Sequence, residues 1–155
     1  VNVNASKIRN RKTEIFSSFI MKNKQKLRKS VNEIINFSKK NNVKLALSTS
    51  TTINNVEAVF KSLSNQISKE DFHFIGNRSL VKYEKPNPEI YKLTLEKLNL
   101  EPDNCLAIED TEESSKSAVS AGIKCIGFPG DYHSDDSFEM CIKKVKILDQ
   151  SLFSL

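Results

Sequence analysis

The chain has 155 residues, of which 38% are hydrophobic and 28% charged, and it carries a formal net charge of +5. This length suits one globular domain with its own core, and this composition lies outside the range of disordered chains. There is neither an apolar run long enough to span a membrane nor an apolar block behind the charged first residues, so we expect no membrane partner and a cytoplasmic protein, or a stromal one in a plastid-bearing source.

The first predicted element is an amphipathic helix over residues 4–20. Its apolar positions are Ile8, Ile15, Phe16, Phe19 and Ile20, and the basic residues in and after it are Lys7, Arg9, Arg11, Lys12, Lys22, Lys24, Lys26, Arg28 and Lys29. The apolar spacing is helical, which places most basic residues on the other side. A basic cluster can contact nucleic acid, but this one has no aromatic residues interleaved for base stacking. We therefore expect a solvated helix face and no nucleic-acid partner.

A helix, a buried strand and another helix are predicted next. Ser30 and Glu33 match a Ser-x-x-Glu capping box, which predicts a helix that ends near Asn41. The continuous apolar run of residues 43–48 predicts a strand buried on both faces, as in a parallel sheet. Residues 56–63 then repeat apolar side chains at the spacing of a helix.

Strands and helices continue to alternate in the second half of the chain. The pattern predicts a strand over residues 72–75, a helix that begins at Asn87 and Pro88 and ends before Pro102, a strand over 105–108, a helix that closes on Gly122, a strand over 123–128 and a last edge strand over 146–148. Such alternation indicates right-handed βαβ units. The expected fold class is α/β, with three layers around a mostly parallel sheet.

Polar side chains follow three of the predicted strands at their carboxyl ends, which is where ligands bind in an open parallel sheet. Thr49 and Ser50 follow the first strand, Lys85 lies after the second, and Glu109 and Asp110 end the third. Hydroxyls at a helix start can hold a phosphoryl oxygen, and two carboxylates beside a phosphate can bind Mg²⁺. Each feature alone also has a plainer explanation, which is helix capping, a common Lys-Pro loop dipeptide or an acidic surface turn.

Three segments together are more specific than any one of these features. KLALSTST, YEKPNPEIY and CLAIEDTEESSKSAVSAGIKCIGF resemble, in order and spacing, motifs II, III and IV of the haloacid dehalogenase (HAD) superfamily of phosphohydrolases. They are most similar to its CbbY-like and β-phosphoglucomutase-like subgroup, which the RKTEIF segment near the N-terminus also resembles. Two departures are Thr111, where the family often has serine, and Ser114, where it often has glycine.

The resemblance implies a role for each candidate residue. Thr49 would hydrogen-bond the transferring phosphoryl group with help from the backbone of Ser50, and Lys85 would bridge that group and the nucleophile. Asp110 would be the principal Mg²⁺ ligand, with Glu109 a second ligand or a holder of metal-bound water. The implied activity is that of a Mg²⁺-dependent phosphatase or phosphomutase that acts on a small phosphorylated metabolite, with sugar phosphates as the expected class.

One part of the family pattern does not occur in the sequence. HAD enzymes attack phosphate with an aspartate in a DxDGT-like motif I, and these 155 residues contain no such motif. In the family this motif and most of a helical cap precede the RKTEIF-like segment. We therefore expect residues 1–25 to be a remnant of the cap and its connection, and residues 26–155 to be the HAD-like core.

The missing motif leads to one structural expectation and two functional hypotheses. The motif I strand normally lies between the strands of motifs II and IV, so a gap or a direct contact between these two strands is expected, together with marginal stability. In the first hypothesis, the chain is the C-terminal part of a phosphatase or phosphomutase whose nucleophile lies elsewhere. In the second, it is a degenerate, non-catalytic domain that binds an anion or a protein partner.

Overall fold

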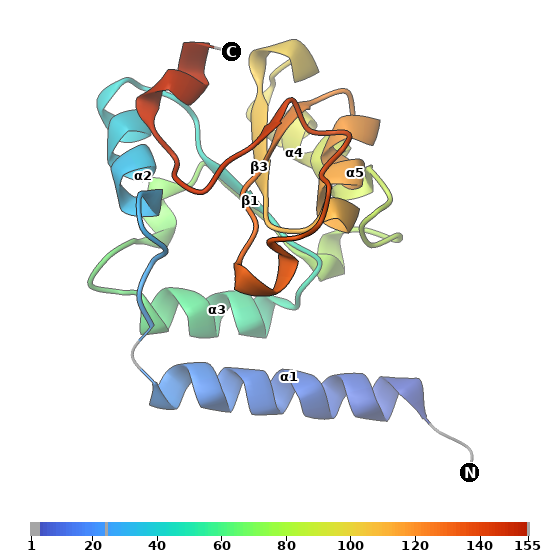
Figure 1. Cartoon of the computed structure of the whole chain (residues 1–155). Coiled ribbons are helices and arrows are strands. Elements are labelled where there is room, and N and C mark those ends of the chain that lie inside the picture. The colour runs from blue at the N-terminus through green and yellow to red at the C-terminus, as the bar shows by residue number, and fades with distance from the viewer. Residues whose placement is uncertain (1–3, 24, 155) are drawn as a thin grey trace.

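Helices alternate with short parallel strands in the computed structural model, which describes residues 4–23 and 25–154 (Figure 1). The helices are α1 (Ala5–Lys22), α2 (Val31–Lys40), α3 (Ile53–Ser62), α4 (Glu89–Leu98) and α5 (Glu112–Ser120), and the strands are β1 (Ala46–Ser48), β2 (Phe74–Gly76), β3 (Leu106–Glu109), β4 (Lys124–Gly127) and β5 (Lys143–Lys144). The α/β class is thus as predicted. No helix within these described ranges is both long enough and apolar enough to cross a membrane.

The strands form two parallel sheets instead of one. β1 pairs with β2, with Ala46 opposite Phe74, while β4 lies between β3 and β5, with Ile108 opposite Ile126. β1 and β3 belong to different sheets and are not hydrogen-bonded neighbours. The resemblance predicted either a gap or a contact at this place, and the structure has the gap.

A cavity of about 550 Å³ lies in this gap, and we call it the inter-sheet slot. Its walls include Ala46 of β1, Leu106 and Ile108 of β3, Ser38 of α2, and Thr94 and Leu95 of α4. The Oγ atom of Ser38 is buried without a hydrogen-bond partner in the part of the chain that the structure describes. A buried hydroxyl without a partner is costly, so the slot is a weak point of the fold.

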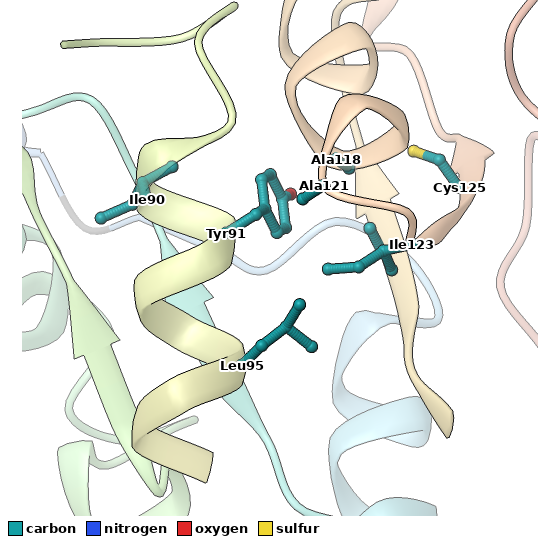
Figure 2. Close-up of a cluster of buried hydrophobic side chains, with 8 residues drawn as sticks. Ile90, Tyr91, Leu95, Ala118, Ala121, Ile123 and Cys125 are labelled. Atoms are coloured by element: carbon teal, nitrogen blue, oxygen red, sulfur yellow. The ribbon is translucent and has the colours of Figure 1, made fainter. Parts of the chain in front are cut away.

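Alternating residues of the β3–β4 sheet supply two separate cores, which explains why these strands read as continuous apolar runs. Cys125 packs with Ile90 and Tyr91 of α4 and Ala118 of α5 on one face (Figure 2). The next residue of β4, Ile126, packs on the other face in the cluster of Ile34, Phe128, Leu148 and Leu152. The sheet therefore has an apolar layer on both sides, as in the predicted three-layer arrangement.

Two local predictions about Ser30 and the C-terminal segment are wrong for the same reason. The Ser30 side chain does not cap α2, because its Oγ accepts a hydrogen bond of 2.8 Å from the backbone N–H of Leu148. Ser30 itself has a left-handed backbone, with φ 72°. Leu148 is therefore held in the core and does not belong to an edge strand, while the last strand lies earlier, at β5, where Lys143 pairs with Ile126.

Helix α1 forms as predicted, but of its five predicted apolar positions only Ile20 is on the side that packs. α1 lies along α3 and apart from the two sheets (Figure 1). Ile8, Ile15 and Phe19 are 57%, 56% and 62% exposed, whereas Ser17 and Ile20 are half-buried. The three exposed side chains contribute little to the docking of α1, so polar contacts such as that of Ser17 add to it.

Gly127 at the end of β4 provides a test of how tightly the core packs beside β5. A Cβ atom added at this position would lie 2.5 Å from Cδ1 of Phe138, which is buried. Such overpacking forces side chains or backbone to move, so Gly127→Ala should lower the free energy of unfolding by about 1–3 kcal/mol, measured by urea denaturation. Gly130→Ala is the matched control, because nothing lies within 4 Å of its added Cβ. Equal urea midpoints for the two variants would contradict this packing.

Candidate active site

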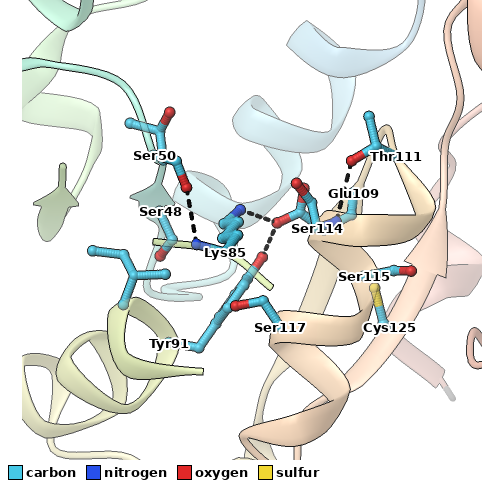
Figure 3. Close-up of polar contacts among 12 residues, drawn as sticks. Ser48, Ser50, Lys85, Tyr91, Glu109, Thr111, Ser114, Ser115, Ser117 and Cys125 are labelled. Atoms are coloured by element: carbon cyan, nitrogen blue, oxygen red, sulfur yellow. Dashed lines mark hydrogen bonds and ion pairs between the residues drawn. The ribbon is translucent and has the colours of Figure 1, made fainter. Parts of the chain in front are cut away.

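The five residues singled out from the sequence line one pocket of about 570 Å³ at the carboxyl ends of the strands. They are Thr49, Ser50, Lys85, Glu109 and Asp110, and they come from the segments after β1, before α4 and at the end of β3. Figure 3 shows Ser50, Lys85 and Glu109 converging. Residues up to 61 positions apart in sequence thus meet because parallel strands point their carboxyl ends to the same edge.

The hydroxyl loop, which we define as residues 49–52, joins β1 to α3. Thr52 is the N-cap of α3 and its side chain accepts from the backbone N–H of Asn55, so the plainer explanation of this cluster, helix capping, applies to Thr52. Thr49 has a different environment, because its Oγ1 accepts a 3.2 Å hydrogen bond from the backbone N–H of Thr51 and lies beside the pocket. The loop therefore offers hydroxyl groups next to a helix N-terminus, an arrangement that favours anions.

Lys85 and Glu109 form a buried ion pair inside the pocket. Their side chains are only 7% and 9% exposed, and the Lys85 ammonium contacts Oε1 of Glu109. The backbone N–H of Lys85 donates to Ser50 Oγ at 3.3 Å, which ties the lysine loop to the hydroxyl loop (Figure 3). The cation therefore has a fixed position near Thr49 and Ser50, with one carboxylate that balances its charge.

Tyr91 is a third member of this buried group, and the sequence interpretation did not single it out. Its hydroxyl donates a hydrogen bond to the same Oε1 of Glu109, and its ring centroid lies 5.0 Å from the Lys85 ammonium nitrogen. Burial, followed by the negative charge of Glu109, raises the pKa of Tyr91 well above its ordinary value. Tyr91 therefore remains a protonated donor, and it was recognisable in sequence only as the last residue of the KPNPEIY segment.

Glu109 and Asp110 have different exposures, as expected for adjacent residues at the end of a strand. Glu109 is buried, whereas Asp110 is exposed at the pocket. No group of three or more His, Cys, Asp or Glu side chains suited to a metal occurs within residues 4–23 and 25–154. Mg²⁺ is usually held by one or two carboxylates together with waters and phosphate oxygens. Because Lys85 and Tyr91 already contact Oε1 of Glu109, Asp110 is the carboxylate of this pair that is open to such a partly hydrated ion.

Lys12 of α1 is a second residue that the sequence interpretation did not place at the site. It lines the pocket just described and also an adjoining one of about 360 Å³, which Thr51, Asn55 and Arg78 line as well. The backbone N–H of Arg78 donates to the Thr51 carbonyl at 2.9 Å. Lys12 lies in the RKTEIF segment, whose resemblance was the only sequence signal at this position, and the packing of α1 on α3 brings it to the site.

Comparisons with known proteins show the family and the fold of the chain. Residues 3–122 match the haloacid dehalogenase-like hydrolase family. The chain is 32% identical to CbbY of Cereibacter sphaeroides over 127 residues, which cover 82% of the chain and 55% of that protein. It is 35% identical to a phosphorylated carbohydrates phosphatase of Thermotoga maritima over 121 residues, which cover 77% of the chain and 52% of that protein. The crystal structure of CbbY from Rhodobacter sphaeroides in complex with phosphate superposes with a TM-score of 0.87 at 28% identity, covering 97% of this chain and 67% of that one. The chain thus spans about half the length of these curated relatives.

Proposed function

We propose that this chain, which belongs to the haloacid dehalogenase-like hydrolase family and its CbbY-like subgroup, provides the phosphate- and Mg²⁺-binding part of a phosphatase or phosphomutase. The observation that carries this proposal is the buried Lys85–Glu109 pair, held in one pocket with Thr49 and Asp110. A cation with a largely buried side chain, fixed beside hydroxyl groups, is suited to hold a phosphoryl group.

In this proposal the residues of the chain position and neutralise the phosphoryl group, which is most of what phosphoryl transfer requires. The Thr49 hydroxyl and the backbone of Ser50 hydrogen-bond the phosphoryl oxygens. The Lys85 ammonium bridges the phosphoryl group and the nucleophile and offsets their negative charge. Mg²⁺ held by Asp110, with Glu109 as a second ligand or as the holder of a bound water, would supply further charge neutralisation. The attacking aspartate, which would form the aspartyl-phosphate, is not among these residues and would have to come from a motif I segment.

The proposed substrate is a small phosphorylated metabolite, with sugar phosphates as the first class to test. The relative from Thermotoga maritima is described as a phosphatase of phosphorylated carbohydrates, which supports this choice. The pocket of about 570 Å³ has room for a phosphoryl group and a small organic part. We also propose that the protein is cytoplasmic and that nucleic acid is not its partner.

Asp110→Asn tests the proposal in a polypeptide that joins these residues to a motif I aspartate. We expect Mg²⁺-dependent hydrolysis of p-nitrophenyl phosphate to fall by about 10³-fold, equivalent to about 4 kcal/mol, because the exposed carboxylate that would bind Mg²⁺ is lost. The matched control is Asp131→Asn, an exposed acid outside the pocket, which should leave the rate unchanged.

The outcome also discriminates between the two hypotheses. Wild-type activity with a normal Mg²⁺ dependence in Asp110→Asn would remove the role assigned to this residue. A polypeptide that carries the motif I aspartate, binds phosphate and yet never hydrolyses the ester would favour the non-catalytic domain, which binds an anion or a protein partner.

A further inference from the structure

Asn55 connects α1 to the hydroxyl loop by two side-chain hydrogen bonds. Its Oδ1 accepts from Ser17 Oγ of α1 at 2.8 Å, and its Nδ2 donates to Thr51 Oγ1 at 2.7 Å. Asn55 itself is fixed in the first turn of α3, where its backbone N–H bonds to Thr52, and its side chain is buried, with the residue 7% exposed. One rigid amide therefore holds a helix on one side and a loop of the candidate site on the other.

The contact continues from Thr51 to the residue proposed to hold phosphate. The backbone N–H of Thr51 donates to Thr49 Oγ1 at 3.2 Å, so the position of Thr51 affects where the Thr49 hydroxyl lies. Thr51 is also held from the other side, because its carbonyl accepts from Arg78. A shift of the Asn55 amide would thus be transmitted to the Thr49 hydroxyl through two bonds of ordinary length.

On the other side, Asn55 determines where α1 lies relative to the pocket. α1 carries Lys12, which lines both the candidate site and the adjoining pocket. Because the apolar residues Ile8, Ile15 and Phe19 of α1 are mostly exposed, they contribute little to holding the helix on α3. The hydrogen bond from half-buried Ser17 to the buried Asn55 amide therefore helps to keep α1, and Lys12 with it, over the site.

We propose that Asn55 is a positioning residue that couples the docking of α1 to phosphate binding by the hydroxyl loop. When phosphate orders Thr49 and Thr51, it also orders the Asn55 amide and thereby α1. Because such coupling is reciprocal, undocking of α1 weakens phosphate binding. This inference rests on the proposed function, because it takes the hydroxyl loop as the place where phosphate binds.

Ser17→Ala is the decisive variant, because Ser17 touches Asn55 and does not line either pocket. In residues 1–155 we expect this change to raise the dissociation constant for inorganic phosphate, measured by calorimetry at a fixed Mg²⁺ concentration, by about 5-fold. It should also raise hydrogen-exchange rates of the α1 amides by about 10-fold. Ser18→Ala, an exposed serine of the same helix, is the matched control and should change neither quantity.

Asn55→Ala should reproduce both effects, and adding Ser17→Ala to it should give no further change, because the serine acts through the amide. In wild type, phosphate should slow exchange of the α1 amides, and Asn55→Ala should remove this effect. Unchanged phosphate affinity in Ser17→Ala, or fully additive effects in the double variant, would overturn the coupling while leaving the proposed function intact. If wild type shows no phosphate binding that depends on Lys85, the proposed function fails and the coupling to phosphate fails with it.

Discussion

Replacing Lys85 by methionine is expected to lower the free energy of unfolding by about 3–5 kcal/mol and to abolish phosphate binding. The side chains of Lys85 and Glu109 are both almost fully buried, so removing the lysine leaves a carboxylate away from water that accepts a hydrogen bond from the Tyr91 hydroxyl and has lost its cation. An unpaired buried charge is far more costly than a missing surface ion pair. Urea denaturation of residues 1–155 measures the loss of stability, and calorimetry with inorganic phosphate measures the loss of binding.

The double variant Lys85→Met with Glu109→Gln serves as the control for this prediction. It removes both charges and keeps a side-chain oxygen that can accept from the Tyr91 hydroxyl, so much of the lost stability should return while phosphate still fails to bind. Lys97→Met, a change at an exposed lysine of α4, should leave stability within about 0.5 kcal/mol of wild type. A double variant as unstable as Lys85→Met alone would show that the buried charge is not the cause.

Filling the inter-sheet slot with an apolar strand is expected to stabilise the fold by several kcal/mol, which for a chain of this size raises the melting temperature by about 10 °C. The slot lies between the unpaired edges of β1 and β3, so a parallel strand gains backbone hydrogen bonds on both sides and buries side chains against α2 and α4. The experiment compares residues 1–155 with the same chain preceded by a segment that carries a motif I strand. Melting temperature and amide exchange of β1 and β3 are the measurements.

A matched segment with lysine at two of its apolar positions is the control for the strand prediction, because charged side chains cannot be buried in the slot without large cost. It should give neither the rise in melting temperature nor protection of β1 and β3. Equal effects of the two segments, or exchange of the β1 and β3 amides that stays as fast as in residues 1–155, would show that the strand does not enter the slot.

The helices and the buried strands could be predicted because each depends on a local pattern. Apolar spacing located α2 to α5, and the continuous runs at residues 43–48 and 105–108 located β1 and β3. Gly122 closes α5 with φ 84°, as its position after an apolar helix indicated. The family resemblance predicted either a gap or a direct contact between β1 and β3, and the pairing of the strands shows the gap.

Predictions failed where a local pattern competed with a distant partner. The Ser-x-x-Glu pattern at Ser30 did not form a capping box, since the hydroxyl bonds to Leu148, 118 positions away. The apolar residues of α1 predicted the right element, but apart from Ile20 they are exposed, and Ser17 meets Asn55 across the helix interface instead. Neither partner is visible in a window of sequence.

The sequence by itself determined the order of elements, the family and the five residues of the candidate site, because periodicity and motif spacing are encoded within short segments. Only the tertiary structure decided that Tyr91 holds Glu109 beside Lys85, that Lys12 reaches the pocket and that Asn55 joins α1 to the hydroxyl loop. These contacts depend on how separate helices and strands pack, and burial then gives them strength by removing water from between the charges and hydroxyls.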